Sequence, residues 1–191
     1  KSRGNVIRPL DLADKYGVDG FRYFLVREMV LGLDSTFSEE AFVRRYNSEL
    51  ANDLGNLLNR TVVMADRYLG GRVPEVKADH PALSPLRTQA SKTVEGAIRS
   101  LEELNPSGVL VSIWELVREA NRYAEVQAPW NLAKDPSRRD ELEATVYGLL
   151  ETMRHLAVLL FPVMPAKAGE IWGQIGGESP IEAQRLGSLQ T

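Results

Sequence analysis

The feature that most constrains the fold of this chain is a long apolar stripe at helical spacing. It begins after Ser38-Glu39-Glu40, where a hydroxyl side chain can cap a helix and two acids complement the positive end of its dipole. It ends at Gly70-Gly71, a typical helix C-cap. Because a long helix with one apolar face needs other helices to cover that face, the stripe predicts a helical bundle. The residues on this face are Leu50, Leu54, Leu57, Leu58, Ala65, Tyr68 and Leu69.

The rest of the chain repeats the helical period between clear breaks. Two short helices are expected before residue 38, and the stretch 72–83, with its two prolines, predicts a linker. Longer helices are predicted over residues 84–105, 107–126, 135–161 and 165–175. We therefore predict an all-α fold, a bundle of about five helices behind a short mixed segment.

The pattern divides the chain into three expected regions. Residues 1–37 form the mixed entry segment, residues 38–177 form the helical bundle, and residues 178–191 show no period and are expected to be a C-terminal tail. The first residue is Lys1 rather than methionine, so we expect the chain to be an excised piece of a longer protein.

Composition excludes several classes of site. The chain of 191 residues has no cysteine, so disulfides and thiolate metal sites are excluded, and we expect no metal site at His80 or His155. The sequence has neither a signal peptide nor a run of about 20 apolar residues, so we expect a cytoplasmic protein without membrane contact. A monomer is a separate expectation, which no feature of the sequence decides. The net charge of −3 counts against nucleic-acid binding through a broad basic stripe. Any such binding must depend on a few local contacts.

Trp130 is the most informative single residue. It follows Pro129 between two predicted helices, whereas Trp114 and Trp172 lie on apolar stripes and are expected in the core. A flat ring held at a helix junction can stack on an unpaired nucleobase. Most tryptophans are nevertheless core residues, and the position alone leaves that possibility open.

Asn56 and Arg60 lie on the outer face of the long helix. With Leu54 at the zero of a helical wheel, they fall at roughly 200° and 240°, one turn apart and away from the core. An amide and a guanidinium together offer the donors and the acceptor that can read the Watson–Crick edge of an exposed cytosine. The same pair is also common on an ordinary solvated helix face, so the pattern alone does not decide.

Four separated motifs together resemble a known family. Lys1-Ser2-Arg3-Gly4-Asn5 is similar to the end of the KMSKS signature loop of class I aminoacyl-tRNA synthetases. Asp19-Gly20-Phe21-Arg22 resembles the Asp-Ala-Leu-Arg signature that follows this loop, with departures at its second and third positions. The stretch 46–57 resembles the start of the helical anticodon-binding domain, and residues 128–134 (APWNLAK) point to the methionyl-tRNA synthetase family within the class.

The resemblance covers nearly the whole chain and assigns roles to individual residues. It implies that Trp130 stacks on an anticodon base, and that Asn56 and Arg60 contact the cytosine that opens the methionine anticodon of the tRNA. It implies that Lys1 helps to stabilise the phosphates of ATP, which the full enzyme uses with Mg. A nucleotide-binding catalytic domain would precede residue 1, so the chain alone is expected to be inactive as a methionine–tRNA ligase.

Two alternatives stay open from the sequence. One is the anticodon-binding domain of another class I synthetase, with a similar bundle and a different anticodon. The other is a helical protein-interaction module in which Trp130 docks a protein partner.

Overall fold

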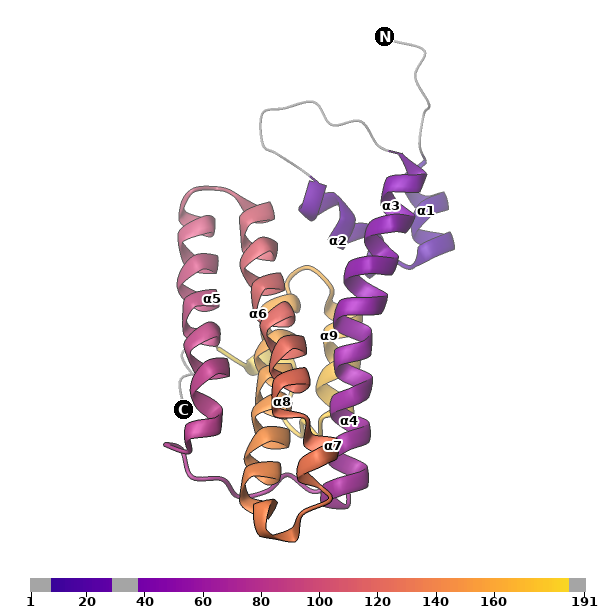
Figure 1. The fold of residues 1–191 in the computed structure, drawn as a ribbon. Helices are drawn as coiled ribbons and strands as arrows, with labels where there is room; N and C mark the ends of the chain where they lie inside the picture. The colour runs from indigo at the N-terminus through magenta and orange to yellow at the C-terminus, as the bar shows by residue number, and fades with distance from the viewer. Residues whose placement is uncertain (1–7, 29–37, 186–191) are drawn as a thin grey trace.

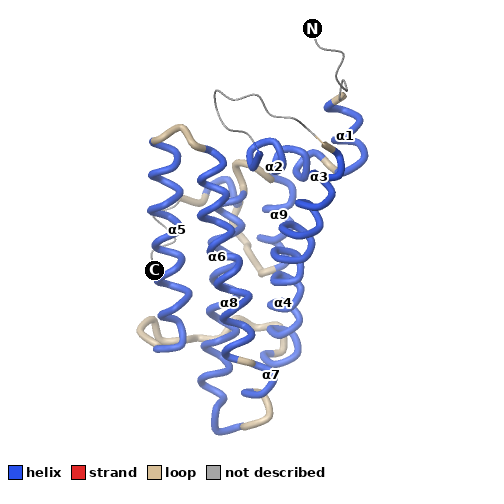
Figure 2. The backbone as a smooth tube through the Cα atoms, turned by 45° about the horizontal axis from the view of Figure 1, so that its top comes forward, coloured by secondary structure: helices blue, strands red, loops and turns tan. Residues whose placement is uncertain are grey.

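The structure is a computed structural model that describes residues 8–28 and 38–185, and all regular elements in these ranges are helices (Figures 1 and 2). The prediction of an all-α protein is therefore confirmed. The α-helices are α1 (Pro9–Tyr16), α2 (Val18–Glu28), α3 (Glu39–Arg45), α4 (Asn56–Leu69), α5 (Ser84–Glu102), α6 (Pro106–Gln127), α7 (Pro129–Leu132), α8 (Arg139–Leu160) and α9 (Pro165–Gln174). The other elements are a π-helix, η1 (Tyr46–Gly55), and three 3₁₀ turns, η2 (Pro81–Leu83), η3 (Pro136–Arg138) and η4 (Ile181–Ala183).

The long predicted helix is built from α3, η1 and α4 in succession. Its ends are those expected: the Ser38 hydroxyl accepts a hydrogen bond from the Ala41 amide, and Gly70 takes a left-handed conformation with φ of 64°. The ten-residue π-helix in its middle was not predicted. It ends at Gly55, where a Cβ atom would lie 3.1 Å from the Leu50 carbonyl oxygen, so the wide turn leaves little room for a side chain.

The core lies around α6 and α8, which Figure 1 shows between α5 on one side and α4 on the other. Both are long helices whose buried residues come mainly from apolar stripes, and α6 contacts α5 and α8. Trp114 on α6 is fully buried and Trp172 on α9 is nearly so, as predicted. The short 3₁₀ turn η4 adds Ile181 to this core, and the Trp172 indole donates to the Ser179 carbonyl at 2.8 Å.

Helix α2 is fastened to the start of α9 by the two charged residues of the Asp19–Arg22 motif. The Asp19 carboxylate accepts from the Lys167 amide at 2.7 Å, which satisfies a donor in the first turn of α9. The Arg22 guanidinium donates to the carbonyls of Pro162 and Val163, at 2.8 Å each. These bonds hold the entry segment against the bundle.

Gly20 inside this motif has a steric reason. A Cβ atom there would lie 2.9 Å from the ring of Tyr46, which packs against α2. The departure from alanine at this position therefore fits the aromatic neighbour that this chain carries.

Within the described residues, no helix combines the length and the apolar character needed to cross a membrane.

Candidate nucleic-acid interface

Trp130 is presented by a sharp reversal of the chain at the end of α6. Ala128 adopts a left-handed conformation with φ of 46° and ψ of 60°, unusual for a residue with a Cβ atom and especially before proline. Its amide closes α6 by donating to Ala124, and its carbonyl accepts from Asn131 at 2.7 Å to open α7. Pro129 and Leu132 are buried, so the short helix is anchored while Trp130 between them is 36% exposed. The prediction that Trp130 lies outside the core is confirmed.

The structure brings Arg60 to this ring. The Arg60 guanidinium carbon lies 5.9 Å from the centre of the Trp130 ring, within the range of a cation–π contact. Because α4 supplies Arg60 and α7 supplies Trp130, two segments 70 residues apart in the sequence form one surface. Side-chain chemistry at this surface combines a stacking platform with a bidentate hydrogen-bond donor.

Asn56 lies on the same side of α4, one turn before Arg60. It is the first residue of the helix and its side chain is exposed. Residues four apart on a helix are neighbours on one face, so the Asn56 amide and the Arg60 guanidinium point outward together. The placement expected from the helical wheel therefore holds.

Glu125 is the member of this surface that the sequence did not predict. Its carboxylate accepts from the Arg60 guanidinium at 2.6 Å. The Glu125 side chain is 62% exposed and the Arg60 side chain 33%. Glu125 lies on α6, just before the reversal at Ala128. An ion pair this accessible to water contributes little to stability, so Arg60 can exchange Glu125 for another partner at small cost.

Several other cations near this end of the bundle already have polar partners. Lys134 donates to the Asn131 side chain at 3.1 Å, and Arg138 and Arg139 pair with the acids Glu141 and Glu143. These contacts are consistent with the net negative charge. They leave the local group around Trp130, rather than a broad basic face, as the candidate for nucleic-acid contact.

The histidines have ordinary partners within the fold. Nε2 of His80 lies 3.1 Å from the Asp140 carboxylate, and its Nδ1 accepts from the Ala82 amide. Nδ1 of His155 lies 2.8 Å from the Glu151 carbonyl oxygen. The described residues contain no group of three or more histidines or acids arranged to hold a metal ion.

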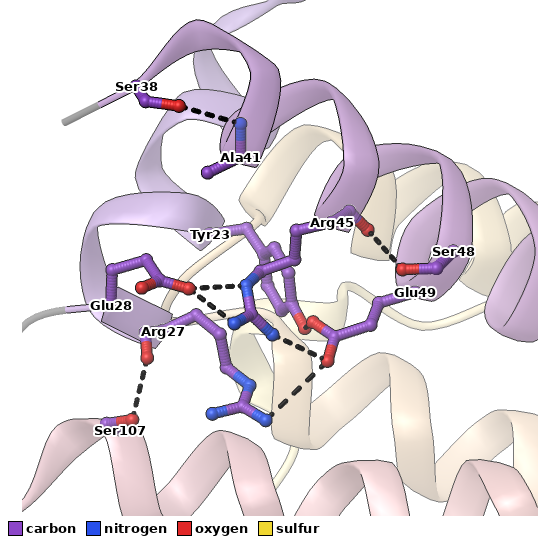
Figure 3. A network of polar contacts seen from close by, with 9 residues as sticks. All are labelled: Tyr23, Arg27, Glu28, Ser38, Ala41, Arg45, Ser48, Glu49 and Ser107. Atoms are coloured by element: carbon purple, nitrogen blue, oxygen red, sulfur yellow. Dashed lines mark hydrogen bonds and ion pairs between the residues drawn. The ribbon is translucent and has the colours of Figure 1, made fainter.

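A second polar group lies at the opposite end of the bundle, where α2 meets α3 and η1 (Figures 1 and 3). Glu49 is its centre: it accepts from the Tyr23 hydroxyl at 2.5 Å and pairs with Arg27 and Arg45. Arg45 also pairs with Glu28. Burial raises the pKa of the Tyr23 hydroxyl, and the bond to Glu49 raises it further. This group joins α2 to η1 and is separate from the Trp130 surface.

Lys1, the residue expected to act on ATP phosphates, lies outside the described residues.

Comparison with protein families gives two matches. Residues 1–62 match the model described as tRNA synthetases class I (M), and residues 85–188, more than half of the chain, match the anticodon-binding domain of tRNA ligase. The chain belongs to the family of anticodon-binding domains of tRNA ligases. The resemblance stated from the motifs is thereby confirmed. Trp130 and Glu125 lie within the residues matched to the anticodon-binding domain, and Asn56 and Arg60 lie within those matched to tRNA synthetases class I (M).

Curated relatives and solved structures agree on the synthetase type. The chain is 44% identical over 182 residues to a methionine–tRNA ligase of Halalkalibacterium halodurans, covering 95% of this chain and 28% of the relative. It is 41% identical over 181 residues to the methionine–tRNA ligase of Bacillus subtilis, covering 92% of this chain and 27% of the relative. The chain thus spans about a quarter of the length of these relatives.

A solved structure supports the same assignment. Mycobacterium tuberculosis methionyl-tRNA synthetase bound by methionyl-adenylate superposes with a TM-score of 0.83 at 39% identity, over 90% of this chain and 34% of that chain.

Proposed function

We propose that this chain recognises the anticodon of methionine tRNA as part of a methionine–tRNA ligase. The observation that supports this most strongly is the contact between Arg60 and the exposed ring of Trp130. It joins a stacking platform to a base-reading side chain on one surface, in a chain of the anticodon-binding family. The methionine specificity follows from the relatives, which are methionine–tRNA ligases.

Stacking and hydrogen bonding divide the work of recognition. A base that stacks on Trp130 gains about 1–3 kcal/mol, with little dependence on which base it is. Asn56 and Arg60, which we call the recognition pair, supply the choice of cytosine. A wrong base would leave their polar groups unpaired after water is displaced, at a cost of about 1–3 kcal/mol.

Arg60 changes partner when the base arrives. In the structure its guanidinium lies near the Trp130 ring and pairs with Glu125. Because this ion pair is exposed to water, the guanidinium can turn toward cytosine with a small loss of free energy. Glu125 holds Arg60 beside the platform until then, and its negative charge opposes the approach of phosphates that do not present the right base.

The proposal extends to the whole ligase. Residues 38–177 form the anticodon-binding bundle, residues 1–37 connect it to a catalytic domain, and residues 178–191 form a tail after the bundle. In that enzyme Lys1 contacts the phosphates of ATP, which is used with Mg, and the protein acts in the cytoplasm as a monomer. The chain by itself is inactive in aminoacylation because the catalytic domain is a separate part of the ligase.

A titration with anticodon stem-loops tests the proposal. The chain should bind a stem-loop with the methionine anticodon more tightly than one whose first base is changed from cytosine to uracil, at a fixed salt concentration. A preference for another anticodon would indicate a different class I synthetase. Absence of any binding difference among stem-loops would overturn the proposal and favour a protein-interaction module.

A further inference from the structure

The contact between α6 and the π-helix points to an additional residue for anticodon recognition. We propose that Asn121 on α6 is a positioning residue that sets the recognition pair, Asn56 and Arg60, at the correct distance from Trp130. This inference rests on the proposed function, because it concerns the same surface. It adds a residue that neither stacks on the base nor reads it.

Asn121 bonds to the chain where the π-helix ends. Its side-chain Nδ2 donates to the Asp53 carbonyl oxygen and to the Val117 carbonyl oxygen, at 3.1 Å each. The Asp53 carbonyl lies at the change from π to α geometry. There the backbone N–H of Asn56 donates to the carbonyls of both Ala51 and Asp53. A carbonyl at such a change of pitch has a weaker backbone partner than one inside a regular helix, and Asn121 supplies a second donor.

The bond belongs to a row of three polar side chains along one face of α6, which we call the polar row. Arg118, Asn121 and Glu125 are spaced at i, i+3 and i+7, so they lie on one face of the helix. Asn121 contacts the Asp53 backbone, and Glu125 pairs with Arg60 at 2.6 Å. Arg118 acts on the Asp53 carboxyl: burial and then Glu49 raise the pKa of that group, and Arg118 opposes the rise.

The polar row connects the two parts of the candidate interface, the start of α4 and the chain reversal that presents Trp130. On one side, Asp53 precedes Asn56 by three residues, so a shift of the Asp53 backbone moves the first turn of α4 and the recognition pair with it. On the other side, α6 continues from Asn121 to Ala128, where the chain reverses and presents Trp130. Asn121 therefore ties together, near their origins, the two segments that carry the base-reading groups and the platform.

The π-helix makes such a tie necessary. A π-helix is rare and occurs mostly as a single-turn insertion in an α-helix, so a ten-residue example needs contacts that keep it from returning to α geometry. Return to α geometry would rotate all later residues of the helix relative to α6. That rotation would turn Asn56 and Arg60 away from Trp130. Asn121 opposes it through its bond near the C-terminal end of the π-helix.

The test compares three variants of this chain with wild type. Asn121→Leu keeps the approximate size of the side chain and removes the donor, and Asn121→Gln restores an amide on a longer stem. Asn52→Leu is the matched control, the same change at an exposed site within η1. Each is titrated with the methionine stem-loop and with the stem-loop that has uracil as the first base. Folding is followed in parallel by thermal unfolding.

The expected result is a loss of base choice with folding retained. Asn121→Leu should reduce the ratio of the two dissociation constants about tenfold, because displaced Asn56 and Arg60 no longer match the cytosine edge. Asn121→Gln should recover part of the ratio, and Asn52→Leu should leave it unchanged. A loss of affinity for both stem-loops in proportion, with the ratio intact, would overturn the inference, as would an unchanged ratio in a folded Asn121→Leu variant.

The design separates this inference from the proposed function. If wild type itself shows no preference for cytosine, the proposed function fails. If wild type shows the preference and Asn121→Leu keeps it, only the positioning role fails. Should Asn121→Leu not fold, Asn121→Gln decides the matter, because its amide lies about one bond farther out and should lower the ratio below that of wild type. A folded Asn121→Gln variant with the wild-type ratio would then overturn the inference.

Discussion

Replacing Trp130 by alanine should separate binding from stability. The ring is 36% exposed, and its partner across the surface is the guanidinium of Arg60. Loss of the cation–π contact costs about 0.5–1 kcal/mol at an exposed site. With the loss of partial burial, we expect a total of about 1–2 kcal/mol of unfolding free energy. In a domain of this size that corresponds to a fall in Tm of about 2–8 °C.

Trp114 provides the matched control for that change. It is fully buried on α6 and packs against Tyr23 with ring centres 4.7 Å apart. Trp114→Ala should cost about 3–5 kcal/mol, which lowers Tm by about 6–20 °C. The same substitution should therefore lower Tm more at Trp114 than at Trp130.

Affinity for the stem-loop should depend more on Trp130 than on Trp114, the reverse of the order expected for Tm. Loss of stacking on Trp130 removes about 1–3 kcal/mol, so the dissociation constant for the methionine stem-loop should rise about 5–150-fold. The assay is a titration of labelled stem-loop at a temperature below both unfolding transitions, with the folded fraction checked by circular dichroism. A fall in Tm for Trp130→Ala as large as that for Trp114→Ala would refute the reasoning, and so would an unchanged dissociation constant.

Three other substitutions test single features of the structure. Gly20→Ala should destabilise the chain by about 1–3 kcal/mol in chemical unfolding, because the added Cβ meets the ring of Tyr46 at 2.9 Å; an unchanged midpoint would argue against that contact. Ala128→Gly should raise stability by about 1 kcal/mol, since glycine adopts positive φ without steric cost; a loss would show that Ala128 is not strained. Glu125→Gln should strengthen stem-loop binding by less than about fivefold at low salt, because Arg60 loses an exposed, screened partner; weaker binding would contradict this account.

Helical periodicity predicted much of the fold and the orientation of the candidate residues. The cap at Ser38 and the glycine at residue 70 mark the ends of the long helix as observed, because both signals act locally. The same periodicity placed Asn56 and Arg60 outward and Trp114 in the core. These features depend on one segment at a time, which is why they can be inferred from sequence alone.

The contacts between segments could not be obtained in this way. The pairing of Arg60 with Glu125 joins residues 65 apart and depends on the register between α4 and α6, which no local pattern specifies. The bond from Asn121 to the Asp53 carbonyl depends in addition on the π-helix. That element has no sequence signal of its own, because its apolar residues are compatible with ordinary helical spacing.

The C-terminal region also differs from what the sequence predicted. Residues 178–191 have no period, and a short segment without a period gives no indication of whether it packs. In the structure Ile181 is buried and the Trp172 indole bonds to the Ser179 carbonyl, so a single apolar residue and one hydrogen bond fix the start of this segment. Burial of an isolated side chain depends on the shape of the surface it meets.

The most direct test of the central claim is a double cycle between Arg60 and the first anticodon base. Wild type and Arg60→Ala are each titrated with stem-loops that carry cytosine or uracil at that position, and the coupling free energy is taken from the four dissociation constants. The account predicts a coupling of about 1 kcal/mol or more, because Arg60 gains hydrogen bonds only from the correct base. A coupling near zero, with cytosine still preferred by both proteins, would show that Arg60 does not read the base.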